Sequence, residues 1–166
     1  IYSVPVNIHR ANVMWNNPTV LADNGIEVPT TWDEFFTAAD KLKAAGIVPL
    51  ALGEQWTQLH LFETVLLGSL GTDAYNGLWD GTTDWGSSDV TDAIEVFGKL
   101  LTYTNDDAAS LSWQDAAQLV IDGDAAFNIM GDWAEGYFRS DLGLVENEGY
   151  GWSPTPGSVG TFQFLS

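Results

Sequence analysis

Two short apolar runs, at 47–52 and 125–130, constrain the fold most strongly. Each run lies next to glycines, at Gly46 and Gly53 for the first and at Gly123 and Gly131 for the second. A short apolar run bounded in this way is typical of a buried strand. Strands that alternate with helices predict an α/β layer structure, in which ligands bind beyond the carboxyl ends of the strands. The residues that follow each run are therefore the first place to look for a site.

Capping residues and apolar spacing predict the helices between these strands. Thr31 can cap a helix that Gly46 ends, while the Glu34 side chain reaches back to the Thr31 backbone to complete a capping box. Ser112 and Asp115 form an acidic variant of the same motif. Periodicity predicts further helices from Trp56 to Leu70, over 89–103, from Ser112 to Asp122, and from Trp133 to Leu142.

The remaining segments are predicted from turn residues and alternation. Gly71 is expected to close the second helix, and 72–88 to form a loop that carries Trp79 and Trp85. Residues 2–8 and 11–16 are expected to be extended, and the tail to be a turn followed by a strand. The helix over 89–103 is expected to face the core with Val90, Ile94, Phe97 and Leu101.

Both apolar runs are followed by the same kind of group. Glu54, Gln55 and Trp56 come after the first run, and Asp132 and Trp133 come after the second. A tryptophan ring stacks on the apolar face of a pyranose, while carboxylates and amides bind its hydroxyls. This pattern predicts the wall of a sugar pocket.

Structural roles compete with this interpretation. Eight tryptophans can simply fill a core or line loops, which is the preferred account of Trp32, Trp113 and Trp152 beside caps and turns. Asp132 can cap a helix. His60, one helical turn after Trp56, is expected to be a partly exposed helical histidine. The chain has two histidines and no cysteine, which makes a poor zinc site.

The charge excludes several classes of partner. The 166 residues include 23 acidic and five basic side chains, a net charge of −18, which repels nucleic acid and anionic lipid. No apolar run reaches the roughly 18 residues of a membrane helix. We interpret the dispersed acidity as adaptation to high salt, which predicts loss of structure when salt is dialysed away.

Two further function classes remain open. A pair of carboxylates across an aromatic cleft would also suit a glycoside hydrolase, although no acid/base motif is present. A non-catalytic interaction module with a vestigial site is the third possibility. No cofactor-binding motif is found, and we expect no catalytic residue, cofactor or metal.

Four segments resemble a known family. They are "YSVPVNIHRANVMWNN", "VPTTWDEFFTAADKLKAAGIVPLALG", "AAFNIMGDWAEGYF" and "SPTPG". Over nearly the whole chain, they resemble the extracellular solute-binding proteins of ABC sugar importers, relatives of maltose-binding protein, and most of all the glucose and monosaccharide subgroup. The resemblance implies one α/β lobe of a two-lobe, type II periplasmic-binding-protein-like fold, with a central sheet flanked by helices.

The resemblance also implies an organisation and partners. Residues 1–166 would be the C-terminal-type lobe, with hinge segments at about 1–10 and 160–166. The whole protein would be an extracellular or periplasmic receptor, associated with the cell surface and tethered to the membrane outside this fragment. It would bind a monosaccharide and deliver it to ABC permease subunits, without catalysis.

Site residues carry over from the resemblance position by position. His9 matches a hinge-side sugar contact that is acidic in maltodextrin receptors, and Asp132 stands where those receptors have proline. Both departures point to a small sugar. The implied ligand-binding residues are His9, Glu54, Gln55, Trp56, Asp132 and Trp133, with His60 and Trp79 as secondary candidates.

Overall fold

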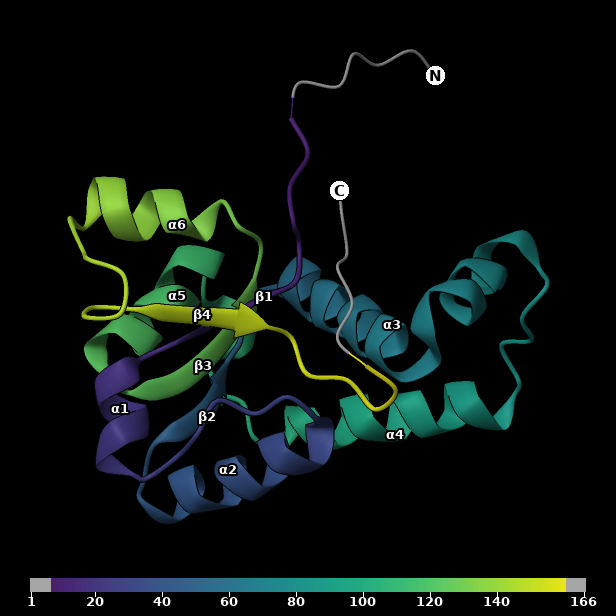
Figure 1. Ribbon diagram of the computed structural model, residues 1–166, viewed down its shortest axis with the longest axis horizontal. Helices are drawn as coiled ribbons and strands as arrows, with labels where there is room; N and C mark the ends of the chain where they lie inside the picture. The colour runs from purple at the N-terminus through teal and green to yellow at the C-terminus, as the bar shows by residue number, and fades with distance from the viewer. Residues whose placement is uncertain (1–6, 161–166) are drawn as a thin grey trace.

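The computed structural model describes residues 7–160 as a sheet between two layers of helices (Figure 1). The strands are β1 (Val13–Asn16), β2 (Val48–Ala51), β3 (Ala125–Met130) and β4 (Gly151–Pro154), in the spatial order β2-β3-β1-β4. The pair β2–β3 is parallel, whereas β1 is antiparallel to both β3 and β4. The predicted α/β layer structure with a central sheet and flanking helices is confirmed.

The described residues form six α-helices, and side-chain caps begin four of them. The six are α1 (Pro18–Asp23), α2 (Trp32–Ala44), α3 (Gln55–Asp80), α4 (Ser88–Leu101), α5 (Trp113–Asp122) and α6 (Ala134–Gly136). The helices with such caps are α1, α2, α4 and α5. A 3₁₀ turn (η1, Ala108–Ser110) and a π-helical turn (η2, Tyr137–Asp141) complete the set. Both predicted capping boxes form: Glu34 N–H donates to Thr31 Oγ1 at 3.2 Å, and Asp115 N–H to Ser112 Oγ at 3.1 Å.

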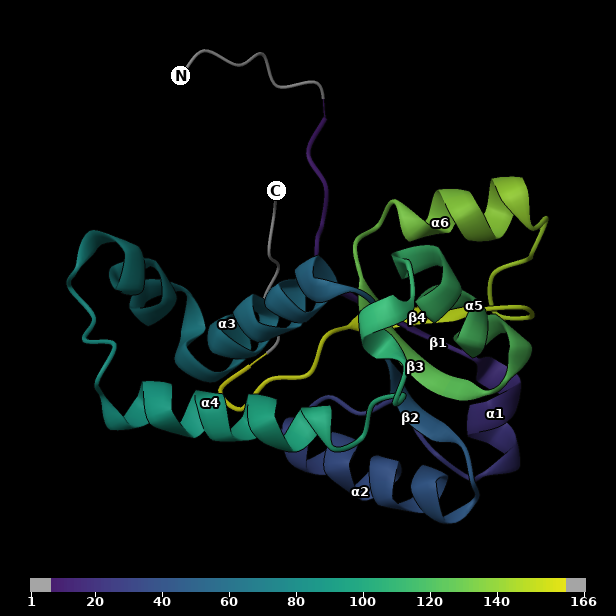
Figure 2. The ribbon, with the colours of Figure 1, turned by 180° about the vertical axis from the view of Figure 1, so that it is seen from behind.

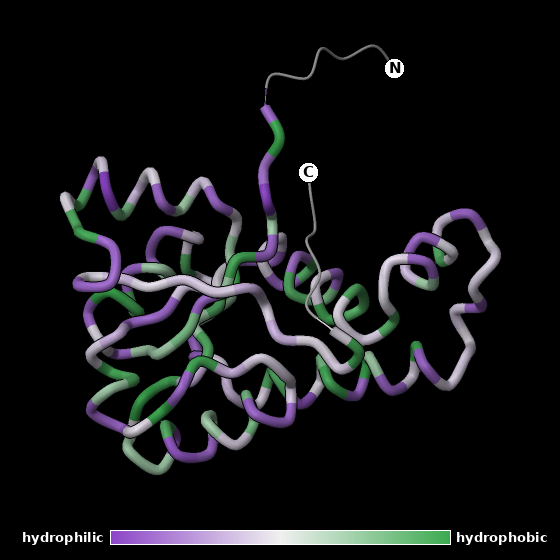
Figure 3. Tube along the Cα trace, viewed as in Figure 1, coloured by the Kyte–Doolittle hydropathy of each residue, from purple (hydrophilic) through white to green (hydrophobic). Residues whose placement is uncertain are grey.

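Each face of the sheet carries its own apolar cluster. On one face, α2, the first part of α3 and the end of α4 bury side chains such as Phe35, Val65 and Leu100 against Phe127. On the other face, α5 and the segment after β3 pack against Trp15. Figure 2 shows the helices on both sides of the sheet, and Figure 3 shows apolar and polar residues alternating along α2 and α4. Among the described residues, no helix combines the length and apolar character that crossing a membrane requires.

The loop predicted over 72–88 is wrong for its first half. Gly71 does break the helix, with φ 75° and ψ 171°, but a second helical segment of α3 follows and runs to Asp80. Tyr75 and Leu78 bury their side chains against α4, and this packing outweighs the turn-like composition. Only the residues between Asp80 and Ser88 form the loop.

The inward face predicted for the helix over 89–103 is also partly wrong. Ile94 is 48% exposed and Leu101 39% exposed, whereas Ala93 and Leu100 are buried beside Val90. The helix packs along α3, where Phe97 contacts Phe62 at 5.2 Å between ring centroids. This packing turns Ala93 inward and leaves Ile94 on the solvent side.

Other differences concern short elements. The helix α1 was not predicted, although Asn17 caps it and Pro18 begins it, both regular start signals. The helix expected from Trp133 to Leu142 is one α-helical turn followed by η2. In the tail, the strand β4 precedes the turn within the described residues. The strands predicted at 2–8 and at the last residues lie largely outside the described residues.

Candidate functional site

The two predicted strand ends meet at one edge of the sheet. Because β2 and β3 are parallel neighbours, with Leu50 opposite Phe127, the residues after both strands emerge on the same side. Trp56 and Trp133 lie there with ring centroids 6.4 Å apart and ring planes inclined by 42°. The segments from two distant parts of the chain therefore form one aromatic surface.

Two histidines complete this surface, which we call the aromatic cluster: His9, Trp56, His60 and Trp133. The His60 ring lies 6.2 Å from Trp56 and 6.1 Å from Trp133. His9 contacts Trp133 edge to face at 5.4 Å. Four of the eight sequence-predicted residues are thus brought together.

Asp132 is held by the segment that precedes β1. His9 Nδ1 lies 2.6 Å from Asp132 Oδ1, and the Arg10 backbone N–H donates to Asp132 Oδ2 at 3.0 Å. The Asp132 N–H donates in turn to the Arg10 carbonyl at 2.9 Å. The carboxylate makes these bonds instead of capping α6, whose N-cap has no side-chain hydrogen bond. Each carboxylate oxygen keeps a lone pair for a hydroxyl donor.

Trp133 owes its position to a glycine. A Cβ atom at Gly131 would lie 2.2 Å from the Trp133 ring, so the indole folds back over the position where a side chain would otherwise stand. The glycine that ends the apolar run of β3 therefore has a second role, because it makes room for the ring.

Trp56 is oriented by its own loop. Its indole Nε1–H donates to Glu54 Oε1 at 3.0 Å, and 40% of the residue remains exposed. Gln55, the first residue of α3, is exposed beside it. This arrangement fixes the ring edge with a carboxylate and leaves a ring face open for stacking.

His60 is buried rather than partly exposed, so the sequence expectation is wrong. The residue is 8% exposed, and its Nε2–H donates to the Ala11 carbonyl at 2.5 Å. Desolvation by burial lowers the pKa of His60, with the bond to Ala11 acting weakly in the opposite direction. His60 therefore contributes a neutral ring that supports the two tryptophans.

Trp79 does not join the aromatic cluster in its ring contacts. It packs edge to face on Tyr75 at 6.0 Å and on Trp85 at 5.5 Å, and is 59% exposed. The second segment of α3 that carries it lies at the opposite end of the molecule from α6 in both views (Figures 1 and 2).

Sequence reasoning missed Asn7 and Arg10. Asn7 Nδ2 lies 2.8 Å from His9 Nε2, on the opposite side of the imidazole from the nitrogen that bonds to Asp132. Burial lowers the pKa of Arg10, and the charge of Asp132 partly offsets this. The signal that could have identified Asn7 and Arg10 was their position in the sequence on either side of His9.

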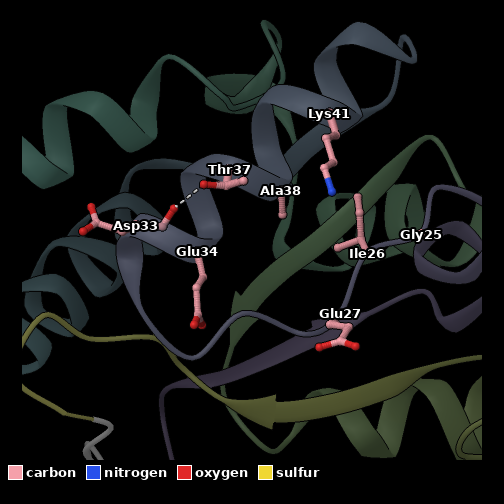
Figure 4. Close-up of a pocket in the computed structure, with 8 residues that line it drawn as sticks. All are labelled: Gly25, Ile26, Glu27, Asp33, Glu34, Thr37, Ala38 and Lys41. Carbon is pink, nitrogen blue, oxygen red and sulfur yellow. Dashed lines mark hydrogen bonds between the residues drawn. The ribbon is translucent and has the colours of Figure 1, made fainter.

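A cavity lies away from the aromatic cluster, between α2 and the segment after α1 (Figure 4). It measures about 480 Å³ and contains none of the predicted site residues. Its Glu34 carboxylate already accepts bonds from Thr30 and Thr31, and the Thr30 backbone bond lowers the Glu34 pKa. Helix capping therefore accounts for Glu34, one of the three acidic residues in the lining. Within 7–160, no three His, Asp or Glu side chains gather as metal ligands would.

The family model of bacterial extracellular solute-binding proteins matches residues 2–162. The chain belongs to this family. A solute-binding protein of this kind, an uncharacterized ABC transporter extracellular-binding protein of Pyrococcus horikoshii, is 38% identical over 95% of this chain and 36% of its own length. A probable sugar-binding periplasmic protein of Brucella suis is 36% identical over 99% of this chain and 39% of its own length.

Solved structures agree with the fold. The bacterial solute receptor AcbH, which has an exclusive substrate preference for β-D-galactopyranose, superimposes with a TM-score of 0.74 at 26% identity, over 90% of this chain and 38% of that receptor. The chain spans between 36% and 39% of the length of the Pyrococcus and Brucella relatives, and less of some others. These relatives and the family place this solute-binding chain at an extracellular or periplasmic location.

Proposed function

We propose that this chain is one lobe of a two-lobe sugar receptor that serves an ABC importer. The lobe binds one pyranose ring, of a monosaccharide such as glucose, on Trp56 and Trp133. One observation carries the proposal: two partly exposed indoles converge from separate strand ends, and each has a carboxylate beside it. Open ring faces bind the apolar side of a sugar, and carboxylate lone pairs accept its hydroxyls.

The form of the site fits half of a clamp. The aromatic cluster is an open surface, whereas small-molecule sites bury most of their ligand. The residues that hold Asp132 belong to the segment proposed as a hinge, at about 1–10, which would leave together with 160–166 toward the second lobe. Closure of the second lobe over the cluster would supply the missing contacts and exclude water.

The proposed receptor delivers sugar to permease subunits and performs no catalysis. Membrane tethering would lie outside residues 1–166. A glycoside hydrolase would instead release product from nitrophenyl glycosides, which a receptor leaves intact.

Calorimetric titration of D-glucose, D-mannose, D-galactose and maltose into the two-lobe protein tests the proposal. We expect one sugar to bind saturably, and Trp133→Ala to weaken it about 10- to 100-fold, since every tenfold corresponds to about 1.4 kcal/mol of stacking and burial. Asp132→Ala should weaken it less.

The matched control is Trp79→Ala, which removes an equally large exposed ring from the other end of the molecule and should leave the affinity unchanged. If the folded two-lobe protein binds none of these sugars, the monosaccharide assignment is wrong and the non-catalytic interaction module becomes the favoured function. An equal loss in Trp79→Ala would show that the site has been placed wrongly.

A further inference from the structure

The two carboxylates beside the aromatic cluster differ in how their charge is balanced. Both oxygens of Asp132 are bonded to the segment before β1, one to His9 Nδ1 and the other to the Arg10 backbone N–H. The Arg10 guanidinium also interacts with this carboxylate, and the charge of Asp132 raises the Arg10 pKa against the larger effect of burial. The charge of Asp132 is therefore balanced by its own neighbours.

Glu54 has no comparable partner among residues 7–160. Its carboxylate accepts from Trp56 Nε1–H at 3.0 Å, makes no side-chain cap to α3, and forms no ion pair within those residues. The sequence contains no Lys or Arg between Lys43 and Lys99. The positive end of the α3 dipole offsets only roughly half a charge. Glu54 therefore brings an unbalanced negative charge to the edge of the Trp56 ring.

This carboxylate and its ring are accessible to a ligand. Glu54 and Trp56 are both exposed at the surface. The bond to Trp56 is made by Oε1, which leaves Oε2 to accept from a ligand. The face of an indole attracts a cation as well as the apolar side of a sugar. The Trp56 face and Glu54 Oε2 together offer two attractions to one positive group.

The remaining charges favour a cation as well. Burial lowers the pKa of His60, so the ring that supports the two tryptophans is neutral near neutral pH. His9 and Arg10, the other basic residues near the aromatic cluster, act on Asp132. The net charge of −18 adds a long-range field that attracts positive ligands.

We propose that the aromatic cluster prefers an amino sugar, a pyranose that carries a primary ammonium group, to the corresponding neutral sugar. This inference rests on the proposed function, because the pyranose ring occupies the aromatic cluster in both cases. The ammonium group donates to Glu54 Oε2 beside the Trp56 face, and hydroxyls of the same ring donate to Asp132. A uronic acid is rejected, because its carboxylate brings a like charge toward Glu54.

The test pairs D-glucose, D-galactose and D-mannose with their 2-amino counterparts in calorimetric titrations of the two-lobe protein. The titrations are run at about pH 6.5, below the pKa of about 8 that is typical of such an amine. For the hexose that binds, we expect the amino sugar to bind about tenfold more tightly, the combined size of a cation–π contact and an exposed ion pair. Its N-acetyl derivative, which keeps the nitrogen and loses the charge, should bind no more tightly than the hexose.

Two variants separate the local charge from the field of the whole protein. Glu54→Gln keeps an oxygen acceptor for Trp56 Nε1–H and should lower the ratio of amino-sugar to hexose affinity from about ten to about three or less. Glu95→Gln is the matched control, because it changes the net charge equally at an exposed position of α4. Its affinity ratio should equal that of the unaltered protein. D-Glucuronic acid gives a readout that needs no variant, and it should bind more weakly than D-glucose.

Three outcomes overturn the preference for an amino sugar. They are an amino sugar that binds no more tightly than its hexose, a ratio unaffected by Glu54→Gln, or an equal loss in Glu95→Gln, which would trace the preference to the net charge. In each case a hexose that still binds leaves the proposed function standing. If hexoses and amino sugars all fail to bind, the proposed function itself is wrong.

Discussion

Two groups of exposed tryptophans in this protein have similar surroundings in the sequence and different ones in the structure. Trp56 and Trp133 come from separate strand ends and lie over the buried ring of His60. Trp79 and Trp85 come from one stretch after the break in α3, and each contacts the other edge to face. Acidic residues adjoin both groups.

The difference separates the proposed sugar-binding surface from a local contact between aromatic rings. In the aromatic cluster, parallel strands bring distant segments together, and hydrogen bonds hold both the rings and Asp132 in place. The Trp79–Trp85 pair is local, and one of its indoles is occupied by the Leu78 carbonyl at 3.0 Å. We therefore place the proposed site at the aromatic cluster, where the topology of the sheet brings a second aromatic segment beside the first.

Gly131→Ala should have the largest effect on this contrast. The new methyl group would displace the Trp133 ring, and the resulting overpacking should cost about 1–3 kcal/mol of unfolding free energy. Sugar affinity should fall about tenfold, because the ring leaves Trp56 and His60. Chemical denaturation and calorimetric titration measure the two effects.

Gly136→Ala is the control for this substitution, since a methyl group there meets nothing within 4 Å inside a helical turn. It should leave affinity unchanged and slightly raise stability. Full affinity in Gly131→Ala would mean that the position of the Trp133 ring does not matter for binding.

Gly71→Ala should have an intermediate effect, confined to the Trp79–Trp85 end. The φ of 75° and ψ of 171° belong to a region that only glycine adopts easily, so alanine should cost about 1–3 kcal/mol of stability. Sugar affinity should not change. Gly98→Ala in α4, where the added methyl meets open space, should be neutral or stabilising. A loss of affinity in Gly71→Ala would contradict the independence of the two ends.

His60 should give the smallest effect, visible as a pH dependence of stability. Burial lowers its pKa in the folded protein, so the unfolded chain, with a pKa of about 6.5, binds the proton more readily. Stability should be full above about pH 6.5 and decline as pH falls through the folded pKa. In His60→Gln, this contribution to the pH dependence of the unfolding free energy should disappear. Denaturation curves measured between about pH 7 and pH 5 test this, and an unchanged pH dependence would mean that other groups cause it.

Local signals predicted local structure well. The capping boxes at Thr31 and Ser112 formed as expected, because their partners are three residues apart and need no tertiary contact. The helical segment after Gly71 could not be predicted in this way, since burial of Tyr75 and Leu78 against α4 stabilises it. The exposed face of α4 escaped prediction for the same reason: a neighbouring helix selects it.

By itself, the sequence determined the alternation of strands and helices, the helix starts marked by the two capping boxes, and the presence of tryptophan and carboxylate after two strands. Those features depend on side chains a few residues apart. Only the tertiary structure decided that β2 and β3 are parallel neighbours, that His60 is buried, and that Asp132 bonds to His9, 123 positions away in the chain. Such contacts arise from packing the whole sheet, because nothing in the local chain brings their partners together.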